Sequence, residues 1–299
     1  MTSEFLIAVL AGLGGMLGWG FADFFAKKTI DEIGDIATLA WAHIFGTLGL
    51  IAFAIYQYNA SARDFFLPDT GKLWLLLAFF GVFQAVVYIL VYKGFGKGQV
   101  AVLAPVFSSF SGITALFSIL FFGEVVRGNV LVALVIVFAG ILLINLDLKG
   151  FREKRFGFMR VDGFKEVALA TVFAALWTLL WDKFLGGQDW LSYSLFMYAF
   201  MTVYIWIVCY VQKIKVFFDK SHVWKFLALI GLCEIVAYLS ISLGYSMTTQ
   251  TSVIALLSGA FSLPTIILAR AFLKEQTTRT QTLGTLVIIA GIMILAMLK

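Results

Sequence analysis

Ten apolar stretches, each long enough to cross a lipid bilayer as a helix, fill most of this chain of 299 residues. The hydrocarbon core of a bilayer is about 30 Å thick, and a helix needs about 20 apolar residues to cross it. Backbone polar groups cannot be left unpaired in lipid, so such a chain folds as a helical bundle. The sequence therefore predicts an all-α, multi-pass membrane protein. The expected spans are 5–27, 35–58, 72–95, 99–123, 127–147, 164–186, 190–212, 222–245, 251–273 and 279–298.

The composition excludes the soluble classes of protein, because 62% of the residues are hydrophobic and only 13% are charged. The net charge of +5 does not indicate a nucleic-acid partner, since the basic residues lie in short loops between the spans. Cys209 and Cys233 fall inside expected spans and are predicted to be buried thiols rather than a disulfide. We expect an integral protein of the cytoplasmic membrane of a prokaryote, surrounded by lipid.

The charges of the loops predict an orientation. Lysine and arginine are concentrated after the first, third, fifth, seventh and ninth spans, most densely in 148–165. The positive-inside rule makes these loops cytoplasmic and leaves both termini outside. A basic segment lying along the membrane surface would bias the same count, and this alternative stays open.

The chain contains an internal repeat. A shift of 151 residues aligns 91–145 with 242–296 without a gap and makes eleven positions identical. We therefore expect a first five-helix repeat in 1–147, a basic connecting loop in 148–163 and a second five-helix repeat in 164–299. An odd number of crossings turns the second repeat upside down in the membrane. The prediction is ten transmembrane helices in two inverted five-helix repeats, with a cavity between them at the midplane.

Three segments resemble the drug/metabolite transporter superfamily, and specifically its ten-span, two-repeat EamA-type members. They are GWGFADFFAKK (18–28), GQVAVLAPVFSSFSGITALFSILFFGEVV (98–126) and SVIALLSGAFSLPTIILARAFLKEQTTRTQTLGTLVIIAGI (252–292). Their most recognisable element is a glutamate that ends the fourth span of each repeat, followed by a Gly-rich helix. The resemblance implies transport of small metabolites, often amino acids or related compounds, and often outward. It also implies cytoplasmic termini, which disagrees with the loop charges.

Glu234 is the most informative single residue, because it lies near the middle of the eighth span. Burying a charge there costs at least ~2.5–3.5 kcal/mol, so such a side chain is normally protonated, paired or in contact with water. Tyr238 follows on the same helix face. At an offset of 150 residues the first repeat has Gln84 and Tyr88. We interpret Glu234 as a proton-coupling or amine-binding group, with a purely structural, protonated glutamate as the alternative.

Two aspartates lie late in their spans. Asp23 follows Trp19 by one turn and precedes Lys27 by another, and Asp182 is next to Lys183. One hypothesis makes the aspartates the two mouths of a pathway. The alternative is ion pairs at helix ends, with tryptophan in the aromatic belt at the interface.

Hydroxyl side chains form a stripe on the fourth and ninth spans. The stripes are Ser111, Thr114 and Ser118, and Ser258, Ser262 and Thr265. Two pairs are repeat equivalents, so both stripes are expected to face the pseudo-symmetry axis and to bind a polar ligand. Packing between helices, worth about 0.6 kcal/mol for each hydroxyl, is the alternative.

Glu124 and Glu275 end these spans and are expected to cap the next helix.

No enzymatic motif accompanies these features. A P-loop, an HExxH pair and a GxSxG elbow are absent, and the two histidines, His43 and His222, stand alone. We therefore expect no metal, no cofactor and no catalytic activity.

The sequence predicts a secondary transporter that moves a small metabolite, such as an amino acid or amine, by alternating access. Export is the expected direction, and a proton is the candidate coupling ion. A flippase for lipids or lipid-linked carriers, and a non-transporting membrane scaffold, are the alternatives. The side chains expected to bind substrate are Trp19, Asp23, Gln84, Tyr88, Ser111, Thr114, Trp177, Glu234, Tyr238, Ser262 and Thr265.

Overall fold

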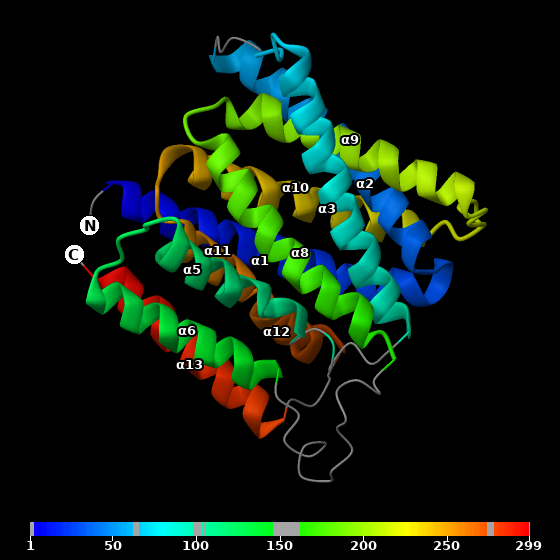
Figure 1. Ribbon diagram of the computed structural model, residues 1–299. Helices are drawn as coiled ribbons and strands as arrows, with labels where there is room; N and C mark the ends of the chain where they lie inside the picture. Colours follow the sequence, from blue (N-terminus) through cyan, green and yellow to red (C-terminus); the bar gives the residue numbers. More distant parts are fainter. Residues whose placement is uncertain are drawn as a thin grey trace.

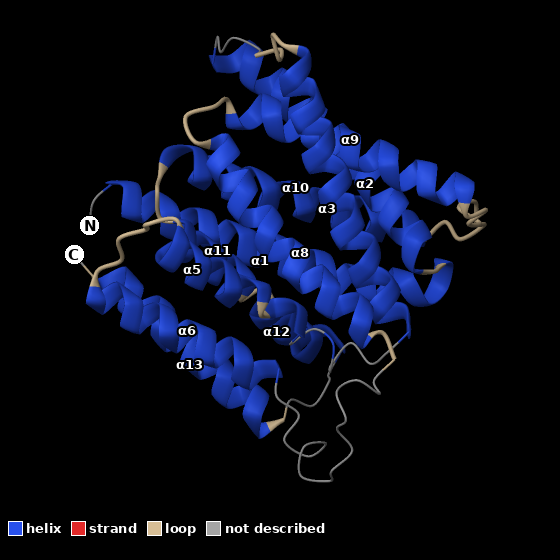
Figure 2. Cartoon of the chain, in the orientation of Figure 1, coloured by secondary structure: helices blue, strands red, loops and turns tan. Residues whose placement is uncertain are grey.

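Helices make up all the regular structure in the part of the chain that the computed structural model describes, residues 3–61, 66–97, 103, 106–145, 162–273 and 278–298 (Figure 2). The first half supplies α1 (Ser3–Ile33), α2 (Asp35–Ser61), α3 (Gly71–Lys97), α5 (Phe110–Phe121) and α6 (Gly128–Asn145). The second supplies α8 (Phe164–Leu185), α9 (Trp190–Val211), α10 (Val223–Met247), α11 (Thr251–Gly259), α12 (Ser262–Leu273) and α13 (Arg279–Met297). Most of the expected connecting loop, residues 146–161, lies outside the described residues.

Seven segments of the described chain are long and apolar enough to cross a membrane. They are α1, α2, α3, α8, α9, α10 and the stretch Thr251–Leu268, and three further apolar helices are shorter. Large apolar side chains also point away from the bundle, such as Leu75 and Val135, which are 73% and 59% exposed. A water-soluble surface would not carry so many of them. The chain is therefore an integral, multi-pass membrane protein.

The ninth expected span, 251–273, contains a stretch long and apolar enough to cross a membrane, Thr251–Leu268, but it is not one continuous helix. α11 ends at Gly259 and α12 begins at Ser262. Pro264 has no N–H to donate to the carbonyl of Ala260, which instead accepts a bond of 2.9 Å from the Leu263 N–H. In the first half a single turn residue, Ser109, precedes α5 at the position equivalent to Ala260. The first repeat thus has a turn residue at the place where the second repeat is interrupted, but its backbone there keeps helical angles, with φ −66° and ψ −13°.

The two halves pack through equivalent contacts. Offsets of 150 and 155 residues relate α3 to α10 and α2 to α9, respectively. A Cβ on Gly81 of α3 would lie 2.5 Å from the carbonyl oxygen of Met197 on α9. A Cβ on the equivalent Gly231 of α10 would lie 2.4 Å from the carbonyl oxygen of Ala42 on α2. The glycines thus let α3 touch the backbone of α9, and α10 touch the backbone of α2, each in the other half.

Equivalent helices also cross each other antiparallel. α6 and α13 lie side by side at one edge of the bundle (Figure 1). Gly140 of α6 faces Ile288 of α13, and their equivalents Gly291 and Val137 face each other in the same way. The residue number therefore rises along one helix as it falls along the other. A pseudo-two-fold axis perpendicular to the helices relates the two.

α2 and α9 obey the same relation on the side of the bundle away from α6 and α13 (Figure 1). The Trp206 indole donates to the carbonyl of Ala40 at 3.1 Å, and the hydroxyls of Tyr58 and Ser192 are 2.8 Å apart. α2 and α9 thus run in opposite directions across the axis, and residues between these contacts, among them His43 and Tyr198, form a buried centre between the two halves.

Candidate functional site

Glu234 lies at this centre, on the face of α10 that packs against α2 and α9. Its side chain is 2% exposed. The hydroxyl of Tyr198, on α9, donates a hydrogen bond of 2.8 Å to Oε2 of Glu234. Nδ1 of His43, on α2, is 3.6 Å from the same oxygen. Helices from both halves therefore place a hydroxyl and an imidazole beside one buried carboxyl group.

His43 is held by three contacts. Its Nδ1 lies 3.0 Å from the carbonyl oxygen of Leu39, one turn earlier on α2. The ring stacks on Tyr198 at a centroid distance of 5.0 Å, and Tyr88 meets it edge-on at 5.3 Å. The side chain is fully buried, and its Nε2 has no hydrogen-bond partner among the described residues.

Tyr238, one turn after Glu234, connects the carboxyl group to three further helices. Nε2 of Gln84, on α3, donates to the Tyr238 hydroxyl at 2.8 Å. Trp19 of α1 and Trp177 of α8 meet the Tyr238 ring edge-on, at 6.0 and 6.3 Å. These are five of the residues that the sequence predicted for the substrate site, together with Tyr88 beside His43. The structure brings all of them around Glu234 and Tyr238.

Several polar atoms in this group are buried without a partner in the described chain. They are Trp19 Nε1, His43 Nε2 and Gln84 Oε1, which give one hydrogen-bond donor and two acceptors. A buried polar atom left unpaired costs about 1–3 kcal/mol, so native proteins pair nearly all of them. Trp177 differs, because its Nε1 donates to the carbonyl of Phe80 at 3.0 Å. These three atoms have hydrogen-bonding capacity that the described chain does not use.

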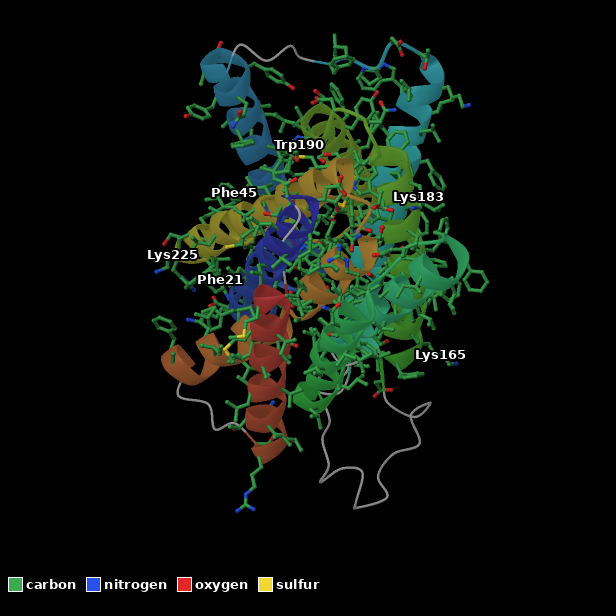
Figure 3. All side chains as sticks on the ribbon, turned by 90° about the vertical axis from the view of Figure 1, so that its left-hand side faces the viewer. Phe21, Phe45, Lys165, Lys183, Trp190 and Lys225 are labelled. Carbon is green, nitrogen blue, oxygen red and sulfur yellow. The ribbon has the colours of Figure 1, made fainter. Side chains whose placement is uncertain are left out.

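The two aspartates occupy different environments. Asp23 is half-buried on α1 and close enough to Glu234 for their charges to interact. Asp182 is buried on α8, where Thr251 donates to it at 2.8 Å and the Lys183 ammonium lies 3.4 Å away. The expected ion pair of Asp182 is present, but its carboxylate also binds the first residue of α11. Figure 3 shows Lys165 and Lys183 near opposite ends of α8, which places Asp182 far from the first turn of that helix.

The hydroxyl stripe of the first repeat, Ser111, Thr114 and Ser118, lies on one buried face of α5, whereas the stripe of the second repeat is divided between α11 and α12. Ser111 donates to the carbonyl of Ser108 at 2.8 Å, and Thr265 donates to the carbonyls of Gly20 and Phe261 at 2.9 and 3.0 Å. These two hydroxyls already bind backbone within or between helices. The hydroxyls of Thr114 and Ser262 are buried without a partner in the described residues. Because the helix is interrupted before Ser262, the expected continuous face from Ser258 to Thr265 does not form.

Glu124 caps a helix, but not the expected one. It accepts bonds from the backbone N–H of Ser252 at 3.0 Å and from its hydroxyl at 2.6 Å, at the beginning of α11 in the other half. The following helix, α6, is not its partner because the chain turns at Gly123, where φ is +69°. Burial raises the pKa of the Glu124 carboxyl, and Ser252 and Lys183 act against that effect. Glu275 lies outside the described residues.

Two residues of the centre were missed in the sequence. His43 was treated as an isolated histidine, and Tyr198 was not singled out. An offset of 155 residues relates them, as it relates Thr47 to Thr202, but the repeat alignment did not extend to these spans.

Within the described residues no group of three or more His, Cys, Asp or Glu side chains could hold a metal ion.

The fold and the site together define a class: a helical membrane bundle whose two similar halves enclose a buried carboxyl group. The chain belongs to the EamA-like transporter family, whose model matches residues 6–146 and 166–297. A solved crystal structure of a protein with 16% sequence identity shares the fold, with a TM-score of 0.75 over 96% of this chain and 95% of that one. No curated protein matches this sequence. The chain is thus a membrane transporter of the drug/metabolite type.

Proposed function

We propose that this protein is a secondary transporter that exports a small, amine-bearing metabolite, such as an amino acid or a related amine. The observation that carries the proposal is the carboxyl group of Glu234, 2% exposed and surrounded by aromatic rings at the centre of the bundle. A carboxyl group at membrane depth marks a binding or coupling site by default. No ATP-binding loop is present in the sequence, so the transport is powered by gradients.

The chemistry around Glu234 suits an organic ammonium. A carboxylate would neutralise the positive charge, and the aromatic rings of Trp19, Trp177 and Tyr238 would provide cation–π attraction, worth about 2 kcal/mol or more when the ion is desolvated. Gln84 Oε1 adds an unpaired hydrogen-bond acceptor. The remaining residues of the predicted site, Asp23, Tyr88, Ser111, Thr114, Ser262 and Thr265, would border this centre in the same pathway.

Transport is proposed to occur by alternating access between two inverted five-helix repeats, which together make ten transmembrane helices. The antiparallel crossing of α6 with α13 and the interruption between α11 and α12 support this architecture. Transporters of this design bind substrate near the midplane, where helices are discontinuous, and rock one half against the other. The bonds that join Glu124 to Ser252 and Asp182 to Thr251 would close one end of the pathway and would break when that end opens.

Glu234 would also couple transport to protons. Because Tyr198 donates to the same carboxyl oxygen that faces His43, the charge of this oxygen would change both contacts. Release of the proton would accompany amine binding, and its return would favour the empty transporter.

The protein would lie in the cytoplasmic membrane of a prokaryote. A reporter fused to each terminus would decide between the outside termini predicted by the loop charges and the cytoplasmic termini of the family.

A ligand panel on the purified protein tests the proposal. Amino acids, amines, nucleosides, sugars and lipids are compared by thermal unfolding of the wild type and Glu234→Gln. A ligand at 100 times its dissociation constant stabilises the folded state by about 2.7 kcal/mol. We expect stabilisation by amines that the variant loses. Stabilisation by long-chain lipids alone would favour a flippase, and a folded protein that no compound stabilises would favour a scaffold.

A further inference from the structure

The tautomer of His43 follows from its surroundings. A backbone carbonyl only accepts hydrogen bonds, so the contact of 3.0 Å between Nδ1 and the carbonyl oxygen of Leu39 requires a proton on Nδ1. In the neutral ring Nε2 is then an acceptor with a free lone pair. This atom is buried and has no partner in the described chain. The histidine therefore presents a bare acceptor at the centre of the protein.

The structural duties of His43 do not involve Nε2. Nδ1 holds the ring to its own helix, and the ring face packs on Tyr198 while Tyr88 packs against its edge. The charged and polar groups that face the imidazole are the Glu234 carboxyl, 3.6 Å from Nδ1, and the two tyrosines. None of the hydrogen bonds that these groups make within the described chain involves Nε2. A buried acceptor without a partner lowers the stability of the fold and adds nothing to packing. A ligand that donates a hydrogen bond to Nε2 would explain why this atom is there.

We propose that His43 Nε2 binds an N–H of the transported molecule and selects ammonium groups that carry hydrogen over quaternary ones. This inference rests on the proposed function, because it assumes an amine near Glu234. Gln84 Oε1 is a second unpaired acceptor, on a side chain that bonds to Tyr238 one turn from Glu234, and an ammonium held by the Glu234 carboxylate would offer its N–H groups to these neutral acceptors. A trimethylammonium group keeps the charge and the cation–π attraction but has no proton to donate. The site would therefore distinguish the two by hydrogen bonding in addition to size.

The test compares 2-phenylethylammonium with its N,N,N-trimethyl analogue. Binding of each to the purified full-length protein is measured by calorimetry for the wild type, His43→Asn and His43→Gln. The asparagine amide can replace the donor at Nδ1 but not the acceptor at Nε2, whereas the glutamine amide reaches the Nε2 position. His222→Asn is the matched control, because this other histidine is exposed and its Nε2 contacts Glu32 at 2.8 Å.

We expect the wild type to prefer the primary ammonium by about tenfold or more, since a hydrogen bond to a charged donor is worth about that factor. His43→Asn abolishes the preference, and His43→Gln and His222→Asn keep it. Equal binding of both compounds by the wild type overturns the inference even if a variant does not fold, and so does a preference that persists in His43→Asn. In these cases the proposed amine transporter stands. Binding of neither compound by the wild type overturns both.

Discussion

The imidazole of His43 lies parallel to the phenol ring of Tyr198, with ring centroids 5.0 Å apart and an interplanar angle of 10°. The two residues occupy equivalent positions of the two halves, 155 residues apart in the sequence. One turn later on each helix, the equivalent hydroxyls of Thr47 and Thr202 are 2.8 Å apart. The pseudo-two-fold axis thus passes between His43 and Tyr198. The equivalent positions of the two repeats therefore carry different side chains, a histidine and a tyrosine. Both side chains contact the same carboxyl oxygen of Glu234.

Removal of the Tyr198 hydroxyl is expected to destabilise the protein. Tyr198→Phe keeps the stacking on His43 but leaves the Glu234 carboxyl without its bond of 2.8 Å, which costs about 1–3 kcal/mol. Unfolding of the purified protein in denaturant measures the change. Tyr210→Phe is the control, because that side chain is 86% exposed and its loss of a hydroxyl should leave stability unchanged. Equal effects of the two substitutions would show that the buried bond adds nothing.

The contact between Thr47 and Thr202 is expected to couple the two halves. We predict that Thr47→Val, Thr202→Val and the double variant give a coupling free energy of about 0.6 kcal/mol, the average for hydrogen bonds between membrane helices. Both hydroxyls also bind a carbonyl of their own helix, so each single variant loses more than the shared contact. Strictly additive effects would mean that the hydroxyls contribute independently.

Gly231 is expected to tolerate no side chain. A Cβ there would lie 2.4 Å from the Ala42 carbonyl oxygen and 2.6 Å from the Gly46 nitrogen, and backbone atoms cannot move aside as a flexible side chain can. Gly231→Ala should therefore separate α10 from α2 and destabilise the protein by about 1–3 kcal/mol. Gly71→Ala is the control, since nothing lies within 4 Å of that position. An unchanged melting temperature for Gly231→Ala would refute the close packing of these helices.

The cap at Glu124 predicts a pH dependence of stability. Burial raises the pKa of this carboxyl above its ordinary value of 4.5, so the folded state holds the proton more tightly than the unfolded state. The contribution of Glu124 to the free energy of unfolding is therefore greatest below pH 4.5 and decreases as the pH rises through the raised pKa. Glu124→Gln should lack this decrease. Melting temperatures of both proteins across this range measure it, and parallel curves would contradict the prediction.

Much of the centre could be predicted from the sequence. Glu234, Tyr238, Gln84 and Tyr88 are recognisable because polar residues are rare in apolar spans and these recur at one offset. Their placement on inward helix faces follows from the spacing of four residues. The sequence could not show which tryptophans would reach Tyr238, since that depends on how α1 and α8 approach α10.

The contacts that were missed or wrongly assigned all join distant segments. Glu124 was expected to cap the helix that follows it, yet it caps α11, 128 residues further along the chain. The interruption between α11 and α12 depends on Pro264, whose effect within a membrane helix ranges from a slight kink to a complete break. Local sequence does not decide between those results.

The sequence by itself determined that this protein is a helical membrane bundle with a repeated design, because lipid permits only internally bonded helices and the length of each apolar run is a local property. It also determined that Glu234 would be exceptional, since a carboxyl group in the middle of an apolar span needs a proton, a partner or water however the helices pack. Only the tertiary structure decided which groups surround that carboxyl. His43 and Tyr198 meet because glycines such as Gly231 allow helices of the two halves to touch, and such close packing is a property of pairs of surfaces rather than of either segment alone.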